Sequence, residues 1–187
     1  KEDAAVYVAV IGLYLLLSDR SKKTRTLGAV IFGIACIYFF AVCAYLNYSG
    51  LGIMEWRYKD YMYRGGALIT SIVVTAFTNP GYILSNLFTG EKLTFTVQTL
   101  GVLSGIPLVS RKIARYILLI PFVLVNLMPT YPYQHSIYFQ YVFGSCVLVI
   151  WLFIMNMSEL SYNRARCFTV FSLVACAVMF MSTMTGY

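Results

Sequence analysis

Apolar stretches separated by charged loops constrain the fold of this chain more than any other sequence feature. These stretches cover residues 4–18, 27–46, 93–109, 113–128, 137–157 and 167–183. A helix that spans a membrane needs roughly 20 predominantly apolar residues, so the first and fourth stretches are short and depend on their flanks. The sequence therefore predicts an all-α fold, a polytopic integral membrane helical bundle with about six transmembrane helices.

The composition agrees with a lipid-covered surface. Of the 187 residues, 60% are hydrophobic and only 11% are charged, whereas a soluble domain carries about 25% charged residues. The formal net charge of +7 could suggest nucleic-acid binding. However, the basic residues are neither continuous nor interleaved with aromatic residues as a nucleic-acid groove requires. We therefore expect membrane lipid as a partner and no nucleic acid.

The charged residues divide unequally between the two sides that this topology predicts. If all the apolar stretches span, the loops 19–26, 110–115 and 158–166 lie on one side, with nine bases and two acids. The opposite side holds five bases and five acids, so the whole net charge of +7 lies on the first side. Cytoplasmic loops carry an excess of Lys and Arg. The sequence predicts a multi-pass protein of the cell membrane with cytoplasmic basic loops and an extracytoplasmic residue 1.

One further apolar segment, residues 65–88, is interrupted by the motif NPG at 79–81. Each half is too short to span alone, and counting the segment as a span would remove the charge asymmetry. We expect two short helices at the outer interface, with one apolar stripe formed by Ile69, Val73 and Phe77. Residues 1–187 then form a single transmembrane domain in which 47–92 is an extracytoplasmic interfacial insertion.

The chain opens with the first of three charged or polar clusters, Lys1-Glu2-Asp3. Acidic residues stabilise a helix N-terminus through the helix dipole, and a lysine at a helix end can extend its amine to the headgroups. Helix capping and anchoring therefore explain this cluster without any catalytic role.

The second cluster is EWRYKDYMYR, residues 55–64. On an α-helix Arg57, Asp60 and Arg64 share one face, which is consistent with ion-paired interfacial structure inside an aromatic belt. The alternative is a clamp in which Arg57, Lys59 or Arg64 holds a lipid-linked phosphate, because guanidinium matches phosphate oxygens. The sequence leaves both interpretations open.

The third cluster is PTYPYQHSIYFQY, which contains the single histidine, His135. A lone histidine among interfacial tyrosines is usually a belt residue, but His135 could also be a phosphate ligand or a proton carrier near neutral pH. The chain contains none of the motifs GxSxG, HExxH, GxGxxG or the Walker loop. No acidic or basic residue lies near the middle of a predicted span, which argues against a transport pathway.

Four segments resemble a family of prokaryotic polytopic membrane proteins catalogued as a domain of unknown function, DUF2079. They are the opening KED, NPGYILSNLF, LGVLSGIPLVS and YQHSIYFQYVFGS. The most specific part is the run Phe139-Gln140-Tyr141 with Phe143-Gly144. The chain departs from the family at His135-Ser136, where relatives have an acidic and an apolar residue, so the resemblance gives His135 no catalytic role.

That family is similar in hydropathy and architecture to the GT-C class of integral-membrane glycosyltransferases. The resemblance implies sugar transfer from a polyprenyl-phosphate donor at the extracytoplasmic face, with this chain as the later half of a longer protein. It also implies phosphate binding by Lys1, Arg57, Lys59 and Arg64. Glu2 and Asp3 would be the catalytic carboxylates, orienting substrate or binding a divalent cation. The alternatives are a non-enzymatic membrane scaffold or lipid-binding subunit and, third, a transporter.

Overall fold

All the secondary structure of the described residues is helical. The computed structural model describes residues 3–18, 21–50, 54–61 and 68–184. The long helices are α1 (Asp3–Leu17), α2 (Lys22–Tyr48), α6 (Phe143–Met157) and α7 (Tyr162–Met184). The short α-helices are α3 (Leu68–Thr78), α4 (Pro80–Leu87) and α5 (Gly90–Thr96). The described part of the chain contains no strand, and the predicted all-α class is confirmed.

Three helical stretches within the described ranges are long and apolar enough to cross a membrane: Lys22–Tyr48, Gln140–Met157 and Tyr162–Thr183. Each corresponds to one of the predicted spans. Two further apolar helical stretches, Asp3–Leu17 and Ile113–Leu127, are shorter. The membrane-helix character of the chain is thus confirmed for three stretches, and the full set of six spans stays a prediction.

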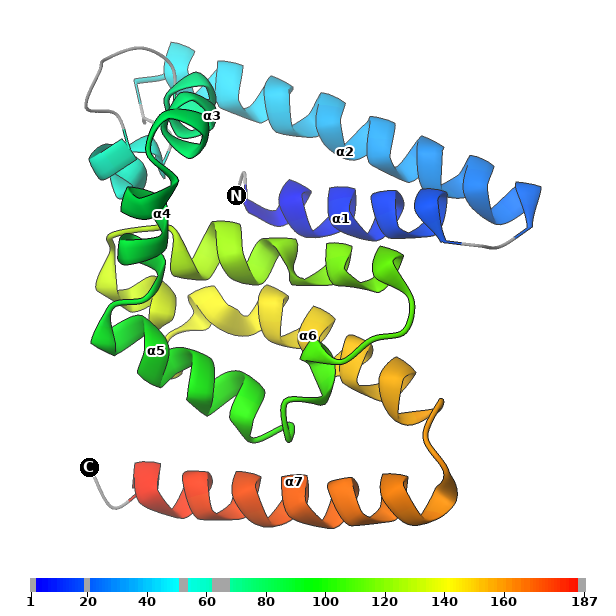
Figure 1. Ribbon diagram of the computed structural model, residues 1–187. Helices are drawn as coiled ribbons and strands as arrows, with labels where there is room; N and C mark the ends of the chain where they lie inside the picture. Colours follow the sequence, from blue (N-terminus) through cyan, green and yellow to red (C-terminus); the bar gives the residue numbers. More distant parts are fainter. Residues whose placement is uncertain (1–2, 19–20, 51–53, 62–67, 185–187) are drawn as a thin grey trace.

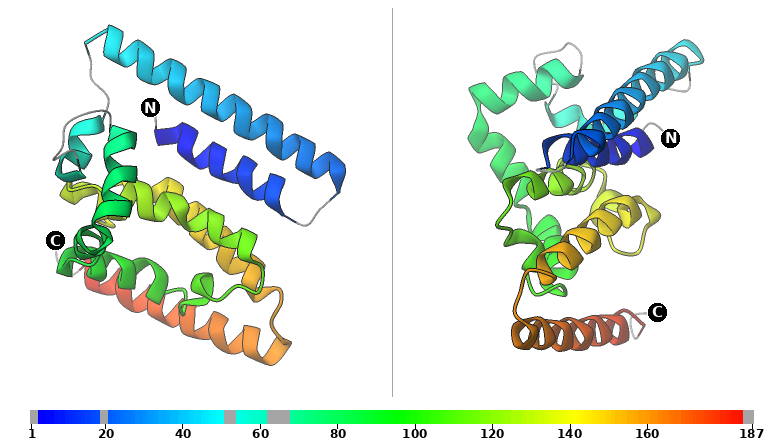
Figure 2. Two further views of the ribbon diagram at one scale, coloured as in Figure 1. Left: turned by 45° about the horizontal axis from the view of Figure 1, so that its top comes forward. Right: turned by 90° about the vertical axis from the view of Figure 1, so that its right-hand side faces the viewer.

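The helices run back and forth between two ends of the molecule (Figures 1 and 2). The start of α2, residues 110–115 and the link between α6 and α7 lie together at one end, which we name the basic end. The start of α1, α3, α4 and the start of α6 lie at the other, which we name the aromatic end. The described parts of the three basic loops thus lie at the same end of the molecule, and their side of the membrane stays a prediction.

Helices α1 and α2 pack closely because each helix has a glycine that lies against the backbone of the other helix. A Cβ atom on Gly12 would lie 2.5 Å from the backbone nitrogen of Phe32. A Cβ atom on Gly28 would lie 2.5 Å from the backbone nitrogen of Leu16. Small residues allow membrane helices to approach to backbone contact, and here only glycine fits.

The region between α5 and α6 departs from the two continuous helices expected over 93–109 and 113–128. Its first part consists of a π-helical turn η2 (Val97–Gly101), the 3₁₀ turns η3 (Ile106–Leu108) and η4 (Ile113–Leu119), and the π-helical turn η5 (Phe122–Leu127). Two further 3₁₀ turns, η6 (Pro132–His135) and η7 (Gln140–Val142), precede α6. Pro121 lies between η4 and η5 and has no N–H to donate to the helical ladder. Such a loss is a common cause of irregular turns within a helix.

The break before η3 is a backbone turn at Ser104 and Gly105, whose φ angles are 57° and 66°. This left-handed conformation is unusual for a serine. The hydroxyl of Ser104 lies 2.9 Å from that of Ser172 on α7, within hydrogen-bond distance. The turn thereby connects α7 to the rest of the bundle.

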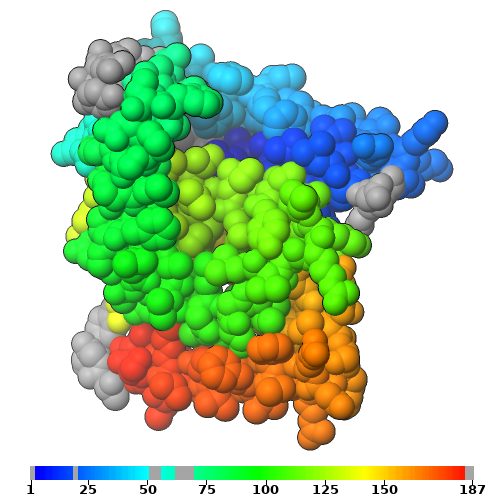
Figure 3. All heavy atoms as spheres, viewed as in Figure 1, coloured from blue at the N-terminus to red at the C-terminus, as the bar shows by residue number. Residues whose placement is uncertain are grey.

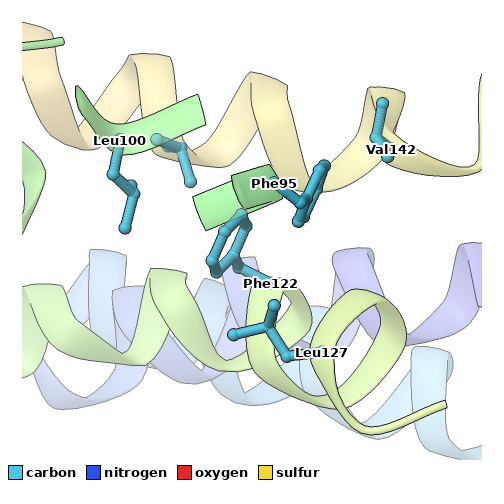
Figure 4. Packing of buried hydrophobic residues seen from close by; sticks show 6 residues of the cluster. Phe95, Leu100, Phe122, Leu127 and Val142 are labelled. Carbon is cyan, nitrogen blue, oxygen red and sulfur yellow. The ribbon is translucent and has the colours of Figure 1, made fainter. Parts of the chain in front are cut away.

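An apolar core joins these irregular turns to α6. The rings of Phe95 and Phe122 stack with centroids 5.4 Å apart and planes 13° from parallel. Figure 4 shows Leu100, Leu127 and Val142 around this pair. The cluster fixes residues 122–127 against α5 and the start of α6, and so positions the segment that follows them at the aromatic end.

The two short helices expected between 65 and 88 are present, and they separate where predicted. The side chain of Asn79 accepts a hydrogen bond of 3.1 Å from the backbone N–H of Tyr82, which caps α4. Proline at the next position suits the first turn of a helix. Figure 3 shows that this segment and α5 form a continuous surface along the edge of the molecule between α2 and α7.

The predicted apolar stripe on α3 faces away from the rest of the chain. Val73 and Phe77 are exposed, the latter to 85%, whereas Ser71 and Thr75 on the opposite face are buried. The hydroxyl of Thr75 donates to the carbonyl of Ser71 at 2.7 Å. The side chain of Ile69, the third member of the stripe, lies outside the described residues.

Candidate functional site

The charged segment at the aromatic end forms a kinked 3₁₀ helix, η1 (Met54–Tyr61), instead of the expected α-helix. The kink lies at Tyr58, with φ −114° and ψ 16°. The two described bases of the segment have different surroundings: Arg57 is turned into the protein and is only 6% exposed, whereas Lys59 is exposed. The described part of the segment, which includes Arg57 and Asp60, is therefore not the α-helix assumed for it, and Arg64 lies outside the described residues.

The Arg57 side chain is enclosed by three aromatic rings, which we name the aromatic cage. Its guanidinium carbon lies 5.4 Å from the ring centroid of Trp56, 4.8 Å from that of Tyr131 and 4.9 Å from that of Tyr141. Aromatic faces attract a cation at these distances. Trp56 and Tyr131 also contact each other edge to face, with centroids 5.0 Å apart. The cage therefore holds the guanidinium in one position.

Three sets of hydrogen bonds attach η1 to residues 124–130. The hydroxyl of Tyr58 donates to the carbonyl of Leu124 at 2.9 Å, and that of Tyr61 donates to the carbonyl of Met128 at 3.3 Å. The carbonyl of Arg57 accepts from the backbone N–H of Thr130 at 2.8 Å and from its hydroxyl at 3.1 Å. These bonds fix the backbone that carries Arg57.

The guanidinium of Arg57 is fixed in place but has an incomplete set of partners. Its Nε and Nη1 atoms are buried and have no hydrogen-bond partner in the described part of the chain. No carboxylate whose position the structure describes lies within ion-pair distance of it. A buried cation without a counter-ion is costly. An anion bound at this position would supply the missing acceptors and charge.

Asp3 lies at the same end, near the Arg57 segment. Burial raises the pKa of the Tyr58 hydroxyl; the positive charge of Arg57 opposes this shift and the negative charge of Asp3 adds to it. Both charges are therefore close enough to act on Tyr58. Of the other predicted site residues, Lys59 points to the exterior, and Lys1, Glu2 and Arg64 lie outside the described residues.

His135 belongs to a neighbouring cluster at the end of η6 (Pro132–His135). It is buried, and its Nε2 lies 3.5 Å from a carboxylate oxygen of Glu91, while its Nδ1 has no hydrogen-bond partner among the described residues. Burial lowers the pKa of His135, and the hydrogen bond that its ring donates to the Glu91 carboxylate only partly opposes this shift. His135 is therefore neutral at neutral pH and can accept a proton, but it brings no fixed positive charge to a phosphate.

An apolar groove of about 240 Å³ runs between α1, α2 and the irregular segment 113–127. Its lining includes Ala5, Ala9, Phe32, Phe39, Ile120 and Leu124. The carbonyl of Leu124 accepts the hydrogen bond from Tyr58 at 2.9 Å. The groove thus reaches the residues next to the aromatic cage, and an apolar chain lying in it could extend from a headgroup at Arg57.

The expected divalent-cation site depends on Glu2 and Asp3, and Glu2 lies outside the described residues. In the described ranges, no group of three or more His, Cys, Asp or Glu side chains is placed to hold a metal ion. The five cysteines, Cys36, Cys43, Cys146, Cys167 and Cys176, are all free thiols.

Comparison with known families identifies the chain. The sequence profile described as predicted membrane protein (DUF2079) matches residues 1–187. The chain belongs to the DUF2079 family. Searches of curated proteins and of solved structures found no match to this DUF2079 protein.

Sequence reasoning about this DUF2079 chain identified Arg57 but not the residues that position it. Two rings of the cage, Tyr131 and Tyr141, belong to a segment distant in sequence and reach Arg57 only in the folded chain. Thr130, in the same segment, fixes the backbone of Arg57. The only sequence signal for Tyr131 and Tyr141 is the high density of tyrosines between residues 131 and 141. That density equally fits an aromatic belt at the membrane interface.

Proposed function

We propose that the aromatic end of this DUF2079 protein binds the phosphate of a polyprenyl-phosphate-linked sugar, as part of a GT-C-like glycosyltransferase acting at the extracytoplasmic face. The observation that carries the proposal is the buried Arg57 guanidinium, which is held by three aromatic rings and has two nitrogens without acceptors in the part of the chain that the structure describes. Guanidinium donors match phosphate oxygens in a bidentate geometry.

The chemistry of the donor explains why a fixed guanidinium is useful. In sugar transfer, the bond between the anomeric carbon and the phosphate oxygen breaks, and the phosphate leaves with the electron pair. Negative charge therefore increases on the phosphate as the reaction proceeds. Donors that are already positioned stabilise such charge without reorganising. Arg57 fits this role because its cage and the bonds from Thr130 set its position before any ligand binds.

The apolar groove supports a lipid-linked donor. It opens next to the Arg57 segment and is lined almost entirely by carbon atoms of α1, α2 and residues 120–124. An isoprenoid chain is wholly apolar and gains free energy from burial there. The phosphate and its lipid chain would then bind to two adjoining parts of the same site.

The acceptor hydroxyl must lose a proton as its oxygen forms the new bond to the anomeric carbon. A carboxylate is the usual base for such a step. Asp3 is a described carboxylate close enough to act on Tyr58, and we assign it and its sequence neighbour Glu2 this type of role, orienting substrate or holding a divalent cation. We assign phosphate contacts to Lys1, Lys59 and Arg64 beside Arg57. His135, in the neighbouring cluster at the end of η6, is a second proton acceptor.

The competing function is a non-enzymatic lipid-binding subunit or scaffold, in which the cage fixes a headgroup without chemistry. The hydrogen bonds from Thr130 and from Tyr58, which join η1 to residues 124–130, would serve this function equally well. A transporter is the third alternative, and it requires ionisable groups near the membrane midplane in the remainder of the protein.

The test follows transfer from a panel of radiolabelled polyprenyl-phosphate sugars by the full-length protein in liposomes. Arg57→Gln should lose at least about 100-fold in turnover, the usual scale for removing one charge-stabilising donor. Arg57→Lys keeps the charge but loses the forked donors, so it should be intermediate. Lys59→Gln removes an exposed member of the same set and should lose less turnover than Arg57→Gln. Arg164→Gln, an exposed base at the opposite end, is the control and should be close to wild type.

Two results separate the alternatives. Loss of turnover in Arg57→Gln with an unchanged melting temperature supports the enzyme. No turnover by a correctly inserted wild type with any donor, together with donor-lipid binding that depends on Arg57, supports the lipid-binding subunit.

A further inference from the structure

A second cavity lies at the basic end, far from Arg57 along the bundle. It has a volume of about 270 Å³ and is lined by Tyr14, Leu17 and Ser18 at the end of α1 and by residues 112–115 at the start of η4. This volume is several times that of one water molecule. The cavity is independent of the site proposed above, and neither the sugar-transfer reaction nor the family description accounts for it.

Two cations of this cavity share a single carboxylate. Arg115 donates from Nη2 to an oxygen of Glu159 at 2.7 Å, and the Nζ atom of Lys112 lies 3.6 Å from the same oxygen. The structure describes no other carboxylate within ion-pair distance of either cation. The cavity wall therefore carries one positive charge in excess, at the end of the molecule where the loops hold the net charge of +7.

Arg115 is fixed by hydrogen bonds to the protein, but not all of its donors have an acceptor among the described residues. It is only 6% exposed, and its Nη1 atom donates to the side-chain oxygen of Asn156 at 2.9 Å and to the carbonyl of Met155 at 3.3 Å. Its Nε atom is buried and has no partner among the described residues. Lys112, in contrast, is 65% exposed and free to turn towards a ligand. The pair combines a fixed and a mobile donor, a common arrangement for binding phosphate.

Besides the two cations and the hydroxyl groups of Tyr14 and Ser18, the cavity is lined by the apolar side chains of Leu17, Ile113 and Ala114. Leu17 and Ile113 are both exposed, Ile113 to 85%. A free phosphate ion gains nothing from such neighbours, whereas the acyl chains of a lipid do. Anionic lipids also concentrate at the membrane surface where basic loops of membrane proteins lie. The surroundings thus favour a lipid over a soluble anion.

We propose that this cavity binds the phosphate headgroup of an anionic phospholipid, with Lys112 and Arg115 contacting the phosphate and Leu17 and Ile113 contacting the acyl chains. Bound lipid would connect the end of α1 to η4 and, through Glu159, to the link between α6 and α7. Lipid bound at this site would therefore stabilise the packing of these elements at the basic end of the bundle.

The test titrates the full-length protein in mixed micelles with phosphatidylglycerol or with phosphatidylcholine of identical chains, and counts bound lipid by native mass spectrometry. Lys112→Gln should weaken phosphatidylglycerol binding about fivefold, the value of one basic residue at an anionic surface. Ala114→Leu, which fills the cavity without changing charge, should weaken it as well. Arg164→Gln removes an exposed base at the same end that does not line the cavity; it is the matched control and should weaken binding less than Lys112→Gln.

Melting temperatures show which variants are folded, and Ala114→Leu tests the site even if Lys112→Gln proves unstable. Equal binding of both lipids, or unchanged phosphatidylglycerol binding in folded Lys112→Gln and Ala114→Leu, would overturn the proposal. Binding of inorganic phosphate as tightly as the lipid would also overturn it, because the site would then be one for a free anion.

Discussion

Thr130 contacts the carbonyl oxygen of Arg57 twice, through its backbone N–H at 2.8 Å and its hydroxyl at 3.1 Å. The residues next to this bonded pair, Trp56 and Tyr131, provide two of the three rings that enclose the guanidinium. One backbone attachment thus brings together both the arginine and its cage. The position of Arg57 depends on Thr130 even though the two residues belong to distant segments.

Replacing Thr130 should therefore loosen the cage. Thr130→Val keeps the shape and the backbone bond but removes the hydroxyl donor, and we expect a loss of about 1 kcal/mol in the free energy of unfolding. Donor turnover should fall with it, because Arg57 loses its fixed position. Thr130→Ser retains the hydroxyl and is the control. Equal melting temperatures and turnover for the two variants would contradict this role.

The contact between α1 and α2 should tolerate no side chain at its two glycines. Gly12→Ala and Gly28→Ala each place a Cβ atom 2.5 Å from a backbone nitrogen of the other helix. We expect each to destabilise the protein by roughly 1–3 kcal/mol, as overpacking usually does. Gly33→Ala on α2 is the control, since its Cβ would meet nothing within 4 Å. Thermal unfolding in detergent measures all three, and a normal melting temperature for Gly12→Ala would show that the helices can separate at no cost.

The ion pairs of Glu159 should make stability depend on acidity. Hydrogen bonding from Arg115 lowers the pKa of Glu159 below its ordinary value of 4.5. Ionised Glu159 therefore stabilises the fold above pH 4.5, and this contribution is lost as the pH falls through the lower pKa of the folded state. Glu159→Gln should be less stable than wild type at neutral pH, with a difference that shrinks in acid. A difference that stays constant with pH would exclude this linkage.

His135 should destabilise the fold at mildly acidic pH. Burial lowers its pKa below the ordinary 6.5, so the unfolded chain takes up a proton at a pH where the folded chain does not. Stability then falls as the pH drops from 6.5 towards the lower pKa of folded His135. His135→Gln should remove this part of the pH dependence. Glu91→Gln, which deletes the contact that favours the charged ring, should enlarge it, and melting curves across this range measure both.

A membrane-impermeant thiol reagent should reach the two ends of the bundle from opposite sides of the membrane. Cys167 near the start of α7 is exposed at the basic end, and Lys59 is exposed at the aromatic end. In inside-out vesicles, a membrane-impermeant maleimide should modify a variant with Cys167 as its single thiol. In intact cells it should modify a cysteine-free variant carrying Lys59→Cys. The opposite pattern would reverse the sidedness that the basic loops predict.

Local sequence signals determined much of the fold. Apolar stretches predicted the three helical stretches that are long enough to span, because membrane insertion depends on the length and composition of one continuous segment. The break between α3 and α4 was equally local, since Asn79 and Pro80 themselves cap and start the second helix. The charge pattern of the loops predicts their side of the membrane, which the labelling experiment above tests.

Tertiary structure alone decided the rest. No sequence period shows that Tyr131 and Tyr141 enclose Arg57, that Gly12 meets Phe32, or that Arg115 and Lys112 share Glu159. Each of these contacts joins segments far apart in the chain, and its geometry depends on how the helices pack. The same packing turned Arg57 inward and Lys59 outward, which neighbouring charges in a short segment could not reveal. Sequence thus determined where the long apolar helices form, because that property is local, while packing decided which charged side chains became buried.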